Sequence, residues 1–303
     1  MRQILIIAIT LLICSAVSGQ TVQVSMGQVK RHEKFASKYV DARNVDVWLP
    51  DGYSDKKRYA VLYMHDGQML YDAATSWNKQ AWEVDETVGK LIKEKKIKDC
   101  IVVGVWNNGA KRWHEYFPAQ AWRMLSDADR QSIIKNAPSG MSALEPISDN
   151  YLKFLVEELK PFIDKTYSTR ADRANTFVAG SSMGSLISLY AISEYPDVFG
   201  GAACISTHWP GLREAENNPI PAAFFAYMKA HLPTPKTHKI YFDYGDQTLD
   251  ALYPPLQKQA DEVMKSKGFT ATNWITKYFP GDDHSEKSWS KRLDIPLLFL
   301  MKR

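Results

Sequence analysis

The chain is poor in cysteine, with three cysteines in 303 residues. No CxxC pair and no HExxH string occurs, so no motif indicates a metal site, and we expect neither a metal nor a cofactor. Cys14 lies near the N-terminus, whereas Cys100 and Cys204 lie in or beside apolar stretches and are expected to be buried free thiols. A disulfide between these two remains open at this stage.

Long basic runs and long apolar runs are also scarce. The net charge is only +4 and no long basic run occurs, which disfavours nucleic acid as a partner. After the N-terminal segment, no apolar stretch is long enough to cross a membrane, so no stable membrane insertion is expected. Repeats and low-complexity linkers are absent from the sequence, and nothing in it indicates an oligomeric state.

The N-terminus has the pattern of a secretory signal. Arg2 supplies a positive charge, residues 4–13 are apolar, and residues 16–20 form a small-residue cleavage zone. We expect cleavage after Gly19 and export to the periplasm or the medium. A lipoprotein signal at Cys14 is disfavoured, because the preceding Ile13 is bulky where a small residue is required.

Strand and helix patterns alternate through residues 20–303, which predicts a single α/β domain with a mostly parallel sheet covered by helices on both faces. An irregular insertion is expected around residues 107–150, with a short helix near 127–135. The expected strands are 21–29, 43–50, 59–64, 101–105, 176–179, 201–206, 240–244 and 272–278. The expected helices are 82–95, 151–167, the segment from 185, 221–232, 256–267 and 289–300.

One stretch points directly to chemistry. A short apolar strand pattern ends in Gly180-Ser-Ser-Met-Gly184, and a helical pattern follows. A G-x-S-x-G sequence between strand and helix is the context of a nucleophile elbow, in which the flanking glycines permit a tight turn and the serine hydroxyl projects above the sheet. Ser182 is therefore the candidate nucleophile.

A serine hydroxyl requires a base, and in this fold class the chain order is serine, acid, histidine. Four histidines follow Ser182, namely His208, His231, His238 and His284. His284 is the candidate base because it follows the last strand, at the sheet edge where Ser182 is expected. Three aspartates, Asp243, Asp246 and Asp250, lie in or after the penultimate strand. Asp250 is favoured for its reach toward His284, and Asp246 remains the alternative acid.

An oxyanion hole needs two backbone N–H groups. The first is expected from Met183, directly after the nucleophile. The second is expected from Gln68, because His65-Asp-Gly-Gln68 follows an early buried strand and Gly67 allows close backbone approach.

Together these segments resemble the putative-esterase (esterase D) family of α/β-hydrolases, which includes feruloyl and acetyl-xylan esterases, siderophore trilactone esterases and mycolyl acyltransferases. The segments that carry the resemblance are 63–68, 82–87, 101–105, 180–184, 248–250 and 281–286, and they span nearly the whole chain after residue 20. The resemblance implies that Ser182 and His284 are nucleophile and base and that Asp250 is the acid. Asp246 departs from the family pattern, since an uncharged residue is expected there.

The resemblance does not fix the substrate. Trp106, Arg112, Glu115 and Trp209 follow strand ends and are expected to line the pocket, where aromatic side chains suit a sugar ring or an aromatic acyl group. The sequence thus predicts an exported serine carboxylesterase acting on a small-molecule or oligosaccharide ester, with acylated carbohydrate favoured. A siderophore trilactone esterase, an acyltransferase of the same fold and a non-catalytic binding protein are the alternatives.

Overall fold

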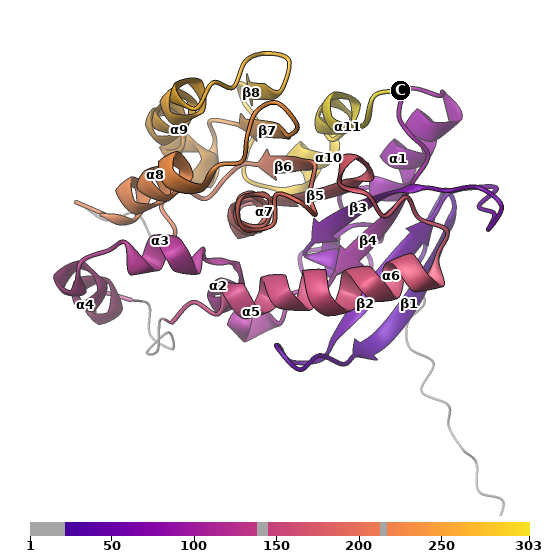
Figure 1. Cartoon of the computed structure of the whole chain (residues 1–303), viewed down its shortest axis with the longest axis horizontal. Helices are drawn as coiled ribbons and strands as arrows, with labels where there is room; N and C mark the ends of the chain where they lie inside the picture. The colour runs from indigo at the N-terminus through magenta and orange to yellow at the C-terminus, as the bar shows by residue number, and fades with distance from the viewer. Residues whose placement is uncertain (1–21, 138–144, 213–216) are drawn as a thin grey trace, which may run out of the picture.

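The computed structural model describes residues 22–137, 145–212 and 217–303. Its centre is an eight-stranded sheet in the order β1-β2-β4-β3-β5-β6-β7-β8 (Figure 1). Strand β2 is antiparallel to both of its neighbours, and all the other pairs are parallel. The strands are β1 Gln28–Phe35, β2 Arg43–Leu49, β3 Ala60–His65, β4 Cys100–Val105, β5 Thr176–Ser181, β6 Gly201–Ile205, β7 Lys239–Tyr244 and β8 Trp274–Tyr278.

Helices cover both faces of this sheet, as the alternation of strand and helix predicts (Figure 1). One face is covered by α1 Val84–Lys93, α10 Glu286–Ser290 and α11 Asp294–Met301. The other is covered by α5 Ser148–Lys153, the π-helical segment Phe154–Leu159, α6 Lys160–Thr166, α7 Met183–Glu194, α8 Ile220–His231 and α9 Pro254–Ser266. The predicted α/β-hydrolase fold is confirmed.

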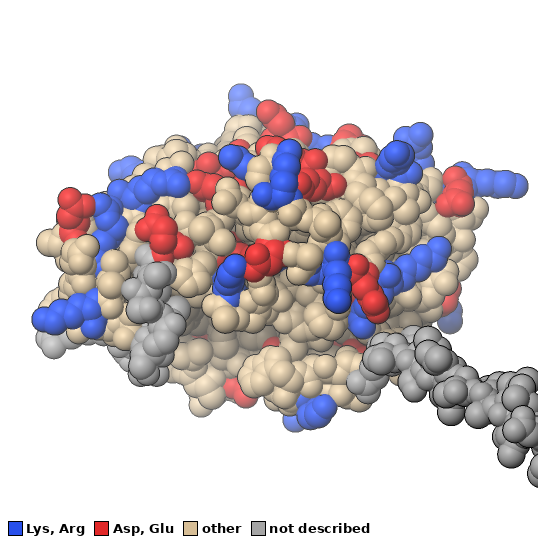
Figure 2. Space-filling model, turned by 90° about the horizontal axis from the view of Figure 1, so that it is seen from below, with Lys and Arg blue, Asp and Glu red and all other residues tan. Residues whose placement is uncertain are grey.

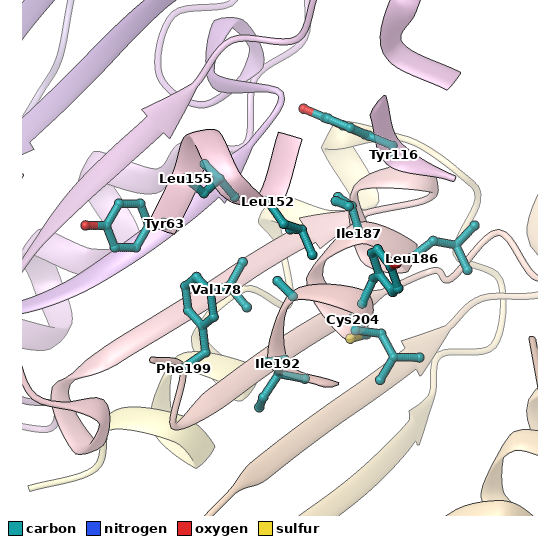
Figure 3. Packing of buried hydrophobic residues seen from close by; sticks show 14 of the residues in the cluster. Tyr63, Tyr116, Leu152, Leu155, Val178, Leu186, Ile187, Ile192, Phe199 and Cys204 are labelled. Atoms are coloured by element: carbon teal, nitrogen blue, oxygen red, sulfur yellow. The ribbon is translucent and has the colours of Figure 1, made fainter. Parts of the chain in front are cut away.

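Strand side chains divide between the two faces with a period of two. In β3, Val61 and Tyr63 enter the core under α7, whereas Leu62 and Met64 enter the core under α1 and α11. Figure 3 shows the first of these cores, with Tyr63 and Val178 of the sheet facing Leu152, Leu155 and Ile187 of the helices. Because β3 and β5 are buried on both faces, their sequences are continuous apolar runs rather than alternating ones. These buried central strands provide a rigid base for the loops at their carboxyl ends.

Three local predictions need correction. The first strand runs over Gln28–Phe35 rather than 21–29, because the backbone N–H groups of Ser25 and Met26 bind the Asp85 carboxylate and Gly27 turns the chain at φ +74°. The last helix is split into α10 and α11. Pro296 lies in the first turn of α11, where its missing N–H is tolerated, but it could not continue a helix from α10.

The third correction concerns the insertion at 107–150, which is largely helical where it is described. It contains the 3₁₀ turn Gly109–Lys111 and the helices α2 Arg112–Tyr116, α3 Ala119–Arg123 and α4 Asp127–Lys135. The last of these is the short helix that the sequence predicts. Residues 138–144 of the insertion, like the predicted signal at 1–19, lie outside the described residues.

Cys100 and Cys204 are both buried free thiols, so the disulfide that the sequence left open between them is not formed. Within the described ranges, no helix is long and apolar enough to cross a membrane. On the face seen in Figure 2, acidic and basic side chains are interspersed rather than gathered by sign.

Candidate active site

Ser182 lies at a sharp turn between β5 and α7. Its backbone has φ 57° and ψ −122°, a conformation that is strained for a residue with a Cβ. The turn requires small neighbours: a Cβ on Gly180 would lie 2.6 Å from the carbonyl oxygen of Gly184. A Cβ on Gly184 would lie 3.2 Å from an oxygen of Asp66. The structure thus contains the strand, tight turn and helix that a nucleophile elbow requires.

The Ser182 hydroxyl is left available for chemistry. Its backbone N–H donates to the carbonyl oxygen of Ile205 at 3.0 Å, which fixes the turn against β6. The side chain does not cap α7, and it lines an open cleft instead. Ser182 also precedes the first turn of α7, where unpaired N–H groups and the helix dipole favour negative charge. The Met183 N–H is one of these N–H groups.

His284 and Asp250 form the second part of the site. Nδ1 of His284 lies 2.6 Å from Oδ1 of Asp250. The backbone N–H of His284 donates to Oγ1 of Thr248 at 2.9 Å, and its ring is nearly perpendicular to that of Trp289, with centroids 5.0 Å apart. His284 lines the same cleft as Ser182, with Nε2 as the ring nitrogen that is left for a reacting group.

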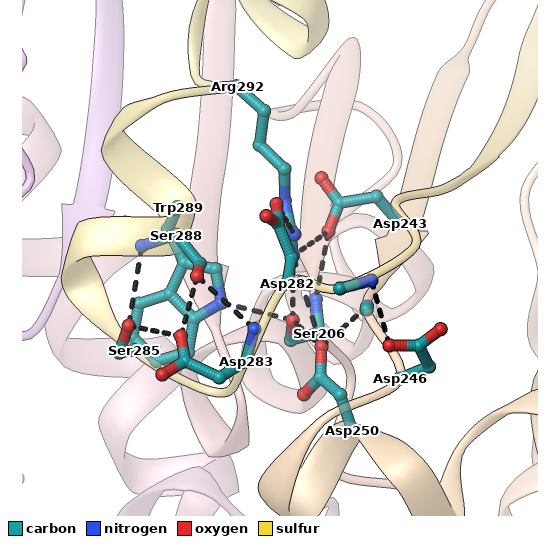
Figure 4. Close-up of polar contacts among 12 residues, drawn as sticks. Ser206, Asp243, Asp246, Asp250, Asp282, Asp283, Ser285, Ser288, Trp289 and Arg292 are labelled. Carbon is teal, nitrogen blue, oxygen red and sulfur yellow. Dashed lines mark hydrogen bonds and ion pairs between the residues drawn. The ribbon is translucent and has the colours of Figure 1, made fainter.

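A buried network holds the Asp250 carboxylate (Figure 4). Its Oδ2 accepts from the Gly245 N–H at 2.7 Å and from the Ser206 hydroxyl at 2.6 Å. The same hydroxyl oxygen accepts from Nε1 of Trp289 and from Nη2 of Arg292, each at 3.0 Å. Sequence reasoning missed Ser206 and Arg292, which have no motif signal and support the site by holding Asp250.

The other two aspartates have different partners. Asp246 lies on the surface and accepts from the Gly281 N–H at 2.9 Å, so it shapes the loop before His284 without contacting that histidine. Asp243 is buried, and burial raises its pKa to about 6. It pairs with Arg292 at 3.1 Å and accepts from the Tyr241 hydroxyl. Of the two aspartates that the sequence left open, Asp250 is the one that contacts His284 in the described part of the chain.

His208, the other histidine at this end of the sheet, is fully engaged elsewhere. Its Nδ1 lies 2.9 Å from the Tyr253 hydroxyl and its Nε2 lies 2.7 Å from the Leu212 carbonyl oxygen. Burial lowers the pKa of its imidazole to about 4. This histidine is a neutral structural residue beside the cleft.

The loop after β3 packs closely against β4 and lines the cleft together with Ser182. Gly67 is required there, because a Cβ would lie 2.5 Å from the backbone carbon of Gly104. Gln68 lines the cleft together with Ser182, and its side-chain oxygen accepts from the Asn107 N–H at 3.2 Å. The Gln68 and Met183 N–H groups thus come from the two backbone segments expected to form an oxyanion hole.

The Asp66 side chain holds this loop against Arg112 and Asn107. Its two oxygens accept from Nε and Nη2 of Arg112 at 2.8 Å each, and Oδ1 also accepts from the Asn107 side chain at 2.7 Å. Burial favours the neutral carboxyl, but the charge and hydrogen bonds of Arg112 outweigh burial and lower the pKa of Asp66. Asp66 itself has φ 58°, so this ion pair holds a strained backbone in place.

The cleft above Ser182 has a volume of about 820 Å³. Among the described residues that line it, the only cation is Arg112, and its charge is paired with Asp66. The remaining lining is mostly aromatic, amide and hydroxyl side chains: Gln68, Met69, Trp77, Asn78, Gln80, Trp82, Asn107, Ser181, Ser285 and Trp289, with Glu286 as a second acidic residue.

Of the four residues expected to line the pocket, only Arg112 does so. Trp106 instead donates to Asp46 at 2.8 Å and stacks under Arg31. Glu115 is buried in an ion pair with Arg43 at 2.7 Å. Trp209 is a core residue whose Nε1 donates to Gln257 at 2.9 Å.

The prediction was wrong for these three because following a strand end does not decide which way a side chain points. The cleft tryptophans come instead from positions that sequence reasoning passed over. Trp77 and Trp82 follow the His65–Gln68 segment, and Trp289 follows His284. Proximity in sequence to these two chemical motifs was the available signal. Among the described residues, no group of three or more His, Cys, Asp or Glu side chains is placed to hold a metal ion.

Comparison with known proteins identifies an esterase family. The family model described as putative esterase matches residues 37–299. The endo-1,4-beta-xylanase/feruloyl esterase of Xylanibacter ruminicola is 26% identical over 264 residues, which are 83% of this chain and 28% of that longer protein. The uncharacterised protein YbbA of Bacillus subtilis is 22% identical over 258 residues, which are 82% of this chain and 89% of that protein.

Solved structures share the fold at low identity. An IroE-like serine hydrolase of Shewanella oneidensis superposes with a TM-score of 0.66 and 15% identity, covering 90% of this chain and 79% of that one. The ferulic acid esterase of Anaeromyces mucronatus, solved in complex with ferulic acid, gives 0.59 and 20%, covering 91% of each chain. By family model and by fold, this chain belongs to the putative-esterase family and is a carboxylic ester hydrolase.

Proposed function

We propose that this protein is an exported serine carboxylesterase that uses Ser182, His284 and Asp250 as a catalytic triad. The observation that carries the proposal is the 2.6 Å contact between Nδ1 of His284 and the buried Asp250 carboxylate, in a cleft that also exposes Ser182. Asp250 fixes the tautomer in which Nδ1 carries the proton, so Nε2 is free to accept the proton of Ser182.

The reaction has two halves. Nε2 of His284 takes the hydroxyl proton as Oγ of Ser182 bonds to the ester carbonyl carbon, and the Met183 and Gln68 N–H groups hold the resulting oxyanion. The carbon–oxygen bond to the alcohol breaks, and His284 gives that oxygen its proton. Water then attacks the acyl-enzyme, its proton passes through His284 to Ser182, and the acid is released.

Acylated carbohydrate is the substrate class that the cleft favours. Its lining of amides, hydroxyls and tryptophans suits a neutral, polar, ring-shaped ligand. A ferric siderophore trilactone carries net negative charge and calls for unpaired cations, whereas Arg112 is already paired with Asp66. The feruloyl esterase similarity of the Xylanibacter relative supports the same choice. An acyltransferase would need to exclude water from the acyl-enzyme, and this cleft is open to solvent.

A substrate screen tests the proposal. Feruloylated and acetylated xylo-oligosaccharides would be compared with a trilactone siderophore at equal concentration, with the released acid measured. We expect turnover of at least one oligosaccharide ester and little of the siderophore. Faster turnover of the siderophore would support a siderophore trilactone esterase. Binding without turnover of any ester would support a non-catalytic binding protein.

Export is part of the proposal and is tested separately. Expression of the full chain in a bacterial host should yield a periplasmic or secreted protein whose N-terminal residue is Gln20, as cleavage after Gly19 requires. A cytoplasmic product that retains residues 1–19 would contradict it.

A further inference from the structure

Trp77 is unusual among the tryptophans of this protein. Its side chain is 81% exposed, yet it lines the same cleft as Ser182 and His284. Trp82 and Trp289, which also line the cleft, are almost fully buried against each other, with ring centroids 5.3 Å apart. An indole face left open to solvent beside a reactive serine is available to stack on a ligand.

The loop that bears Trp77 is tied to the loop that bears His284. Nδ2 of Asn78 donates to Oε2 of Glu286 at 2.8 Å, and the Lys287 N–H donates to Oε1 of Gln80 at 3.3 Å. Within its own loop, the Gln80 N–H donates to Oδ1 of Asn78 at 3.1 Å. Trp77 is therefore positioned on the His284 side of the cleft.

The start of the same loop is tied to a different segment. Gln68 and Asp66 accept hydrogen bonds from Asn107, and Asp66 pairs with Arg112, so this part of the loop contacts the segment after β4. Ser182 lines the same cleft. The later part of the loop, with Trp77, thus contacts the segment that holds the base, whereas its start holds the Gln68 N–H.

This division assigns the two halves of an ester. The histidine that protonates the leaving alcohol must lie beside that alcohol. We propose, on the basis of the proposed esterase function, that Trp77, with the side chains of Asn78, Gln80 and Glu286, forms a sugar subsite for the alcohol half of the substrate. The indole stacks on the apolar face of a pyranose or furanose ring, and the amides and carboxylate bind its hydroxyl groups.

A matched pair of substrates tests this assignment, because both carry the same acyl group and differ only in the alcohol. Methyl ferulate and a feruloylated arabinoxylo-oligosaccharide form such a pair, and acetyl esters of methanol and of a xylo-oligosaccharide form another. We expect Trp77→Ala to raise KM for the oligosaccharide ester about tenfold with little change in kcat, and to affect the methyl ester much less. Trp77→Phe should restore most of the loss, and Met124→Ala, which changes an exposed residue outside the cleft, serves as the control.

Equal fractional losses on both esters, or an unchanged KM for the oligosaccharide ester, would overturn the sugar subsite while leaving the esterase intact. If wild type hydrolyses neither ester, the esterase proposal fails, and calorimetry decides the subsite. If wild type binds a xylo-oligosaccharide and Trp77→Ala weakens this binding about tenfold, the result would support the sugar subsite. Binding that is absent, or equal in both proteins, would reject it.

Discussion

At the scale of single residues, the Asp250 carboxylate has a distinct partner on each oxygen. Oδ1 faces His284, whereas Oδ2 is held by the Gly245 N–H and the Ser206 hydroxyl. Ser206 can donate to Asp250 because its own oxygen accepts from Trp289 and Arg292. A buried carboxylate with a partner on each oxygen keeps its orientation, which a residue that orients a catalytic histidine requires.

The first prediction separates the two candidate acids. Asp250→Asn should lower kcat on a p-nitrophenyl ester by about three to four orders of magnitude, because the amide can favour the wrong imidazole tautomer. Asp246→Asn is the matched control and should change kcat by less than about twofold, since Asp246 is only half-buried and binds the Gly281 N–H rather than His284. A larger loss from Asp246→Asn than from Asp250→Asn would assign the acid to Asp246.

The motif residues of this site were predictable from sequence, because short-range rules specify them. Gly180, Ser182 and Gly184 follow from the steric needs of one turn, and His284 follows from its place after the last strand. Trp209 was not predictable, because its direction depends on α8 and α9 packing against it. Ser206 was equally hidden, since its partner Arg292 lies 86 residues further along the chain.

At the scale of elements, the turn between β5 and α7 is the most constrained part of the fold. The backbone of Gly184 lies so close to Gly180 that no side chain fits between them, and Ser182 is held at positive φ. The buried strands β5 and β6 on either side of the turn supply the packing that maintains this strain.

The second prediction tests that constraint. Gly180→Ala should lower the free energy of unfolding by about 1–3 kcal/mol and reduce kcat, because its Cβ would displace the Gly184 backbone and with it Ser182. The control is Gly89→Ala in α1. The three atoms nearest to the added Cβ all belong to the Met26 side chain, at 3.0 Å, and alanine favours the helix, so stability should change by less than about 1 kcal/mol. Urea denaturation and ester hydrolysis measure the two effects. Equal stability and activity in both variants would contradict the account.

Element boundaries show where sequence patterns suffice. The apolar runs of β3, β4 and β5 locate these strands within a residue or two, because a strand buried on both faces has a continuous apolar sequence. Strand β1 was misplaced because it is an edge strand with an exposed, weakly alternating sequence. The contacts that bend residues 25–27 away from the sheet come from Asp85, which no local pattern indicates.

At the scale of the whole molecule, two buried histidines link stability to pH. His65 is buried, its Nδ1 contacts the Tyr151 hydroxyl at 2.9 Å, and its Nε2 has no hydrogen-bond partner in the described part of the chain. Burial lowers its pKa from 6.5 to about 3, and burial likewise lowers that of His208 to about 4. The folded protein therefore resists protonation that the unfolded chain accepts.

The third prediction follows from the sign of this shift. The stabilising contribution of a neutral His65 is fully present above pH 6.5 and is lost as the pH falls from 6.5 toward 3, because the unfolded state binds the proton first. His65→Asn keeps a polar group beside Tyr151 but cannot titrate. Between pH 7 and pH 4.5, it should lose less stability than wild type, by on the order of 2 kcal/mol.

Urea denaturation at both pH values measures this difference, and His231→Asn, at an exposed histidine, is the control. The wild-type pH dependence should persist in the control. A His65→Asn variant with the same loss of stability as wild type would show that His65 does not carry the effect.

Ser182 becomes acylated in the proposed mechanism, and an irreversible serine reagent can trap this residue as a covalent adduct. Wild type treated with a fluorophosphonate ester should gain one phosphonyl group, and peptide mass spectrometry should place it on Ser182. Ser182→Ala should gain none and should lose ester hydrolysis, whereas Ser181→Ala keeps the nucleophile and should still be labelled. An adduct on another residue, or undiminished hydrolysis by Ser182→Ala, would contradict the account.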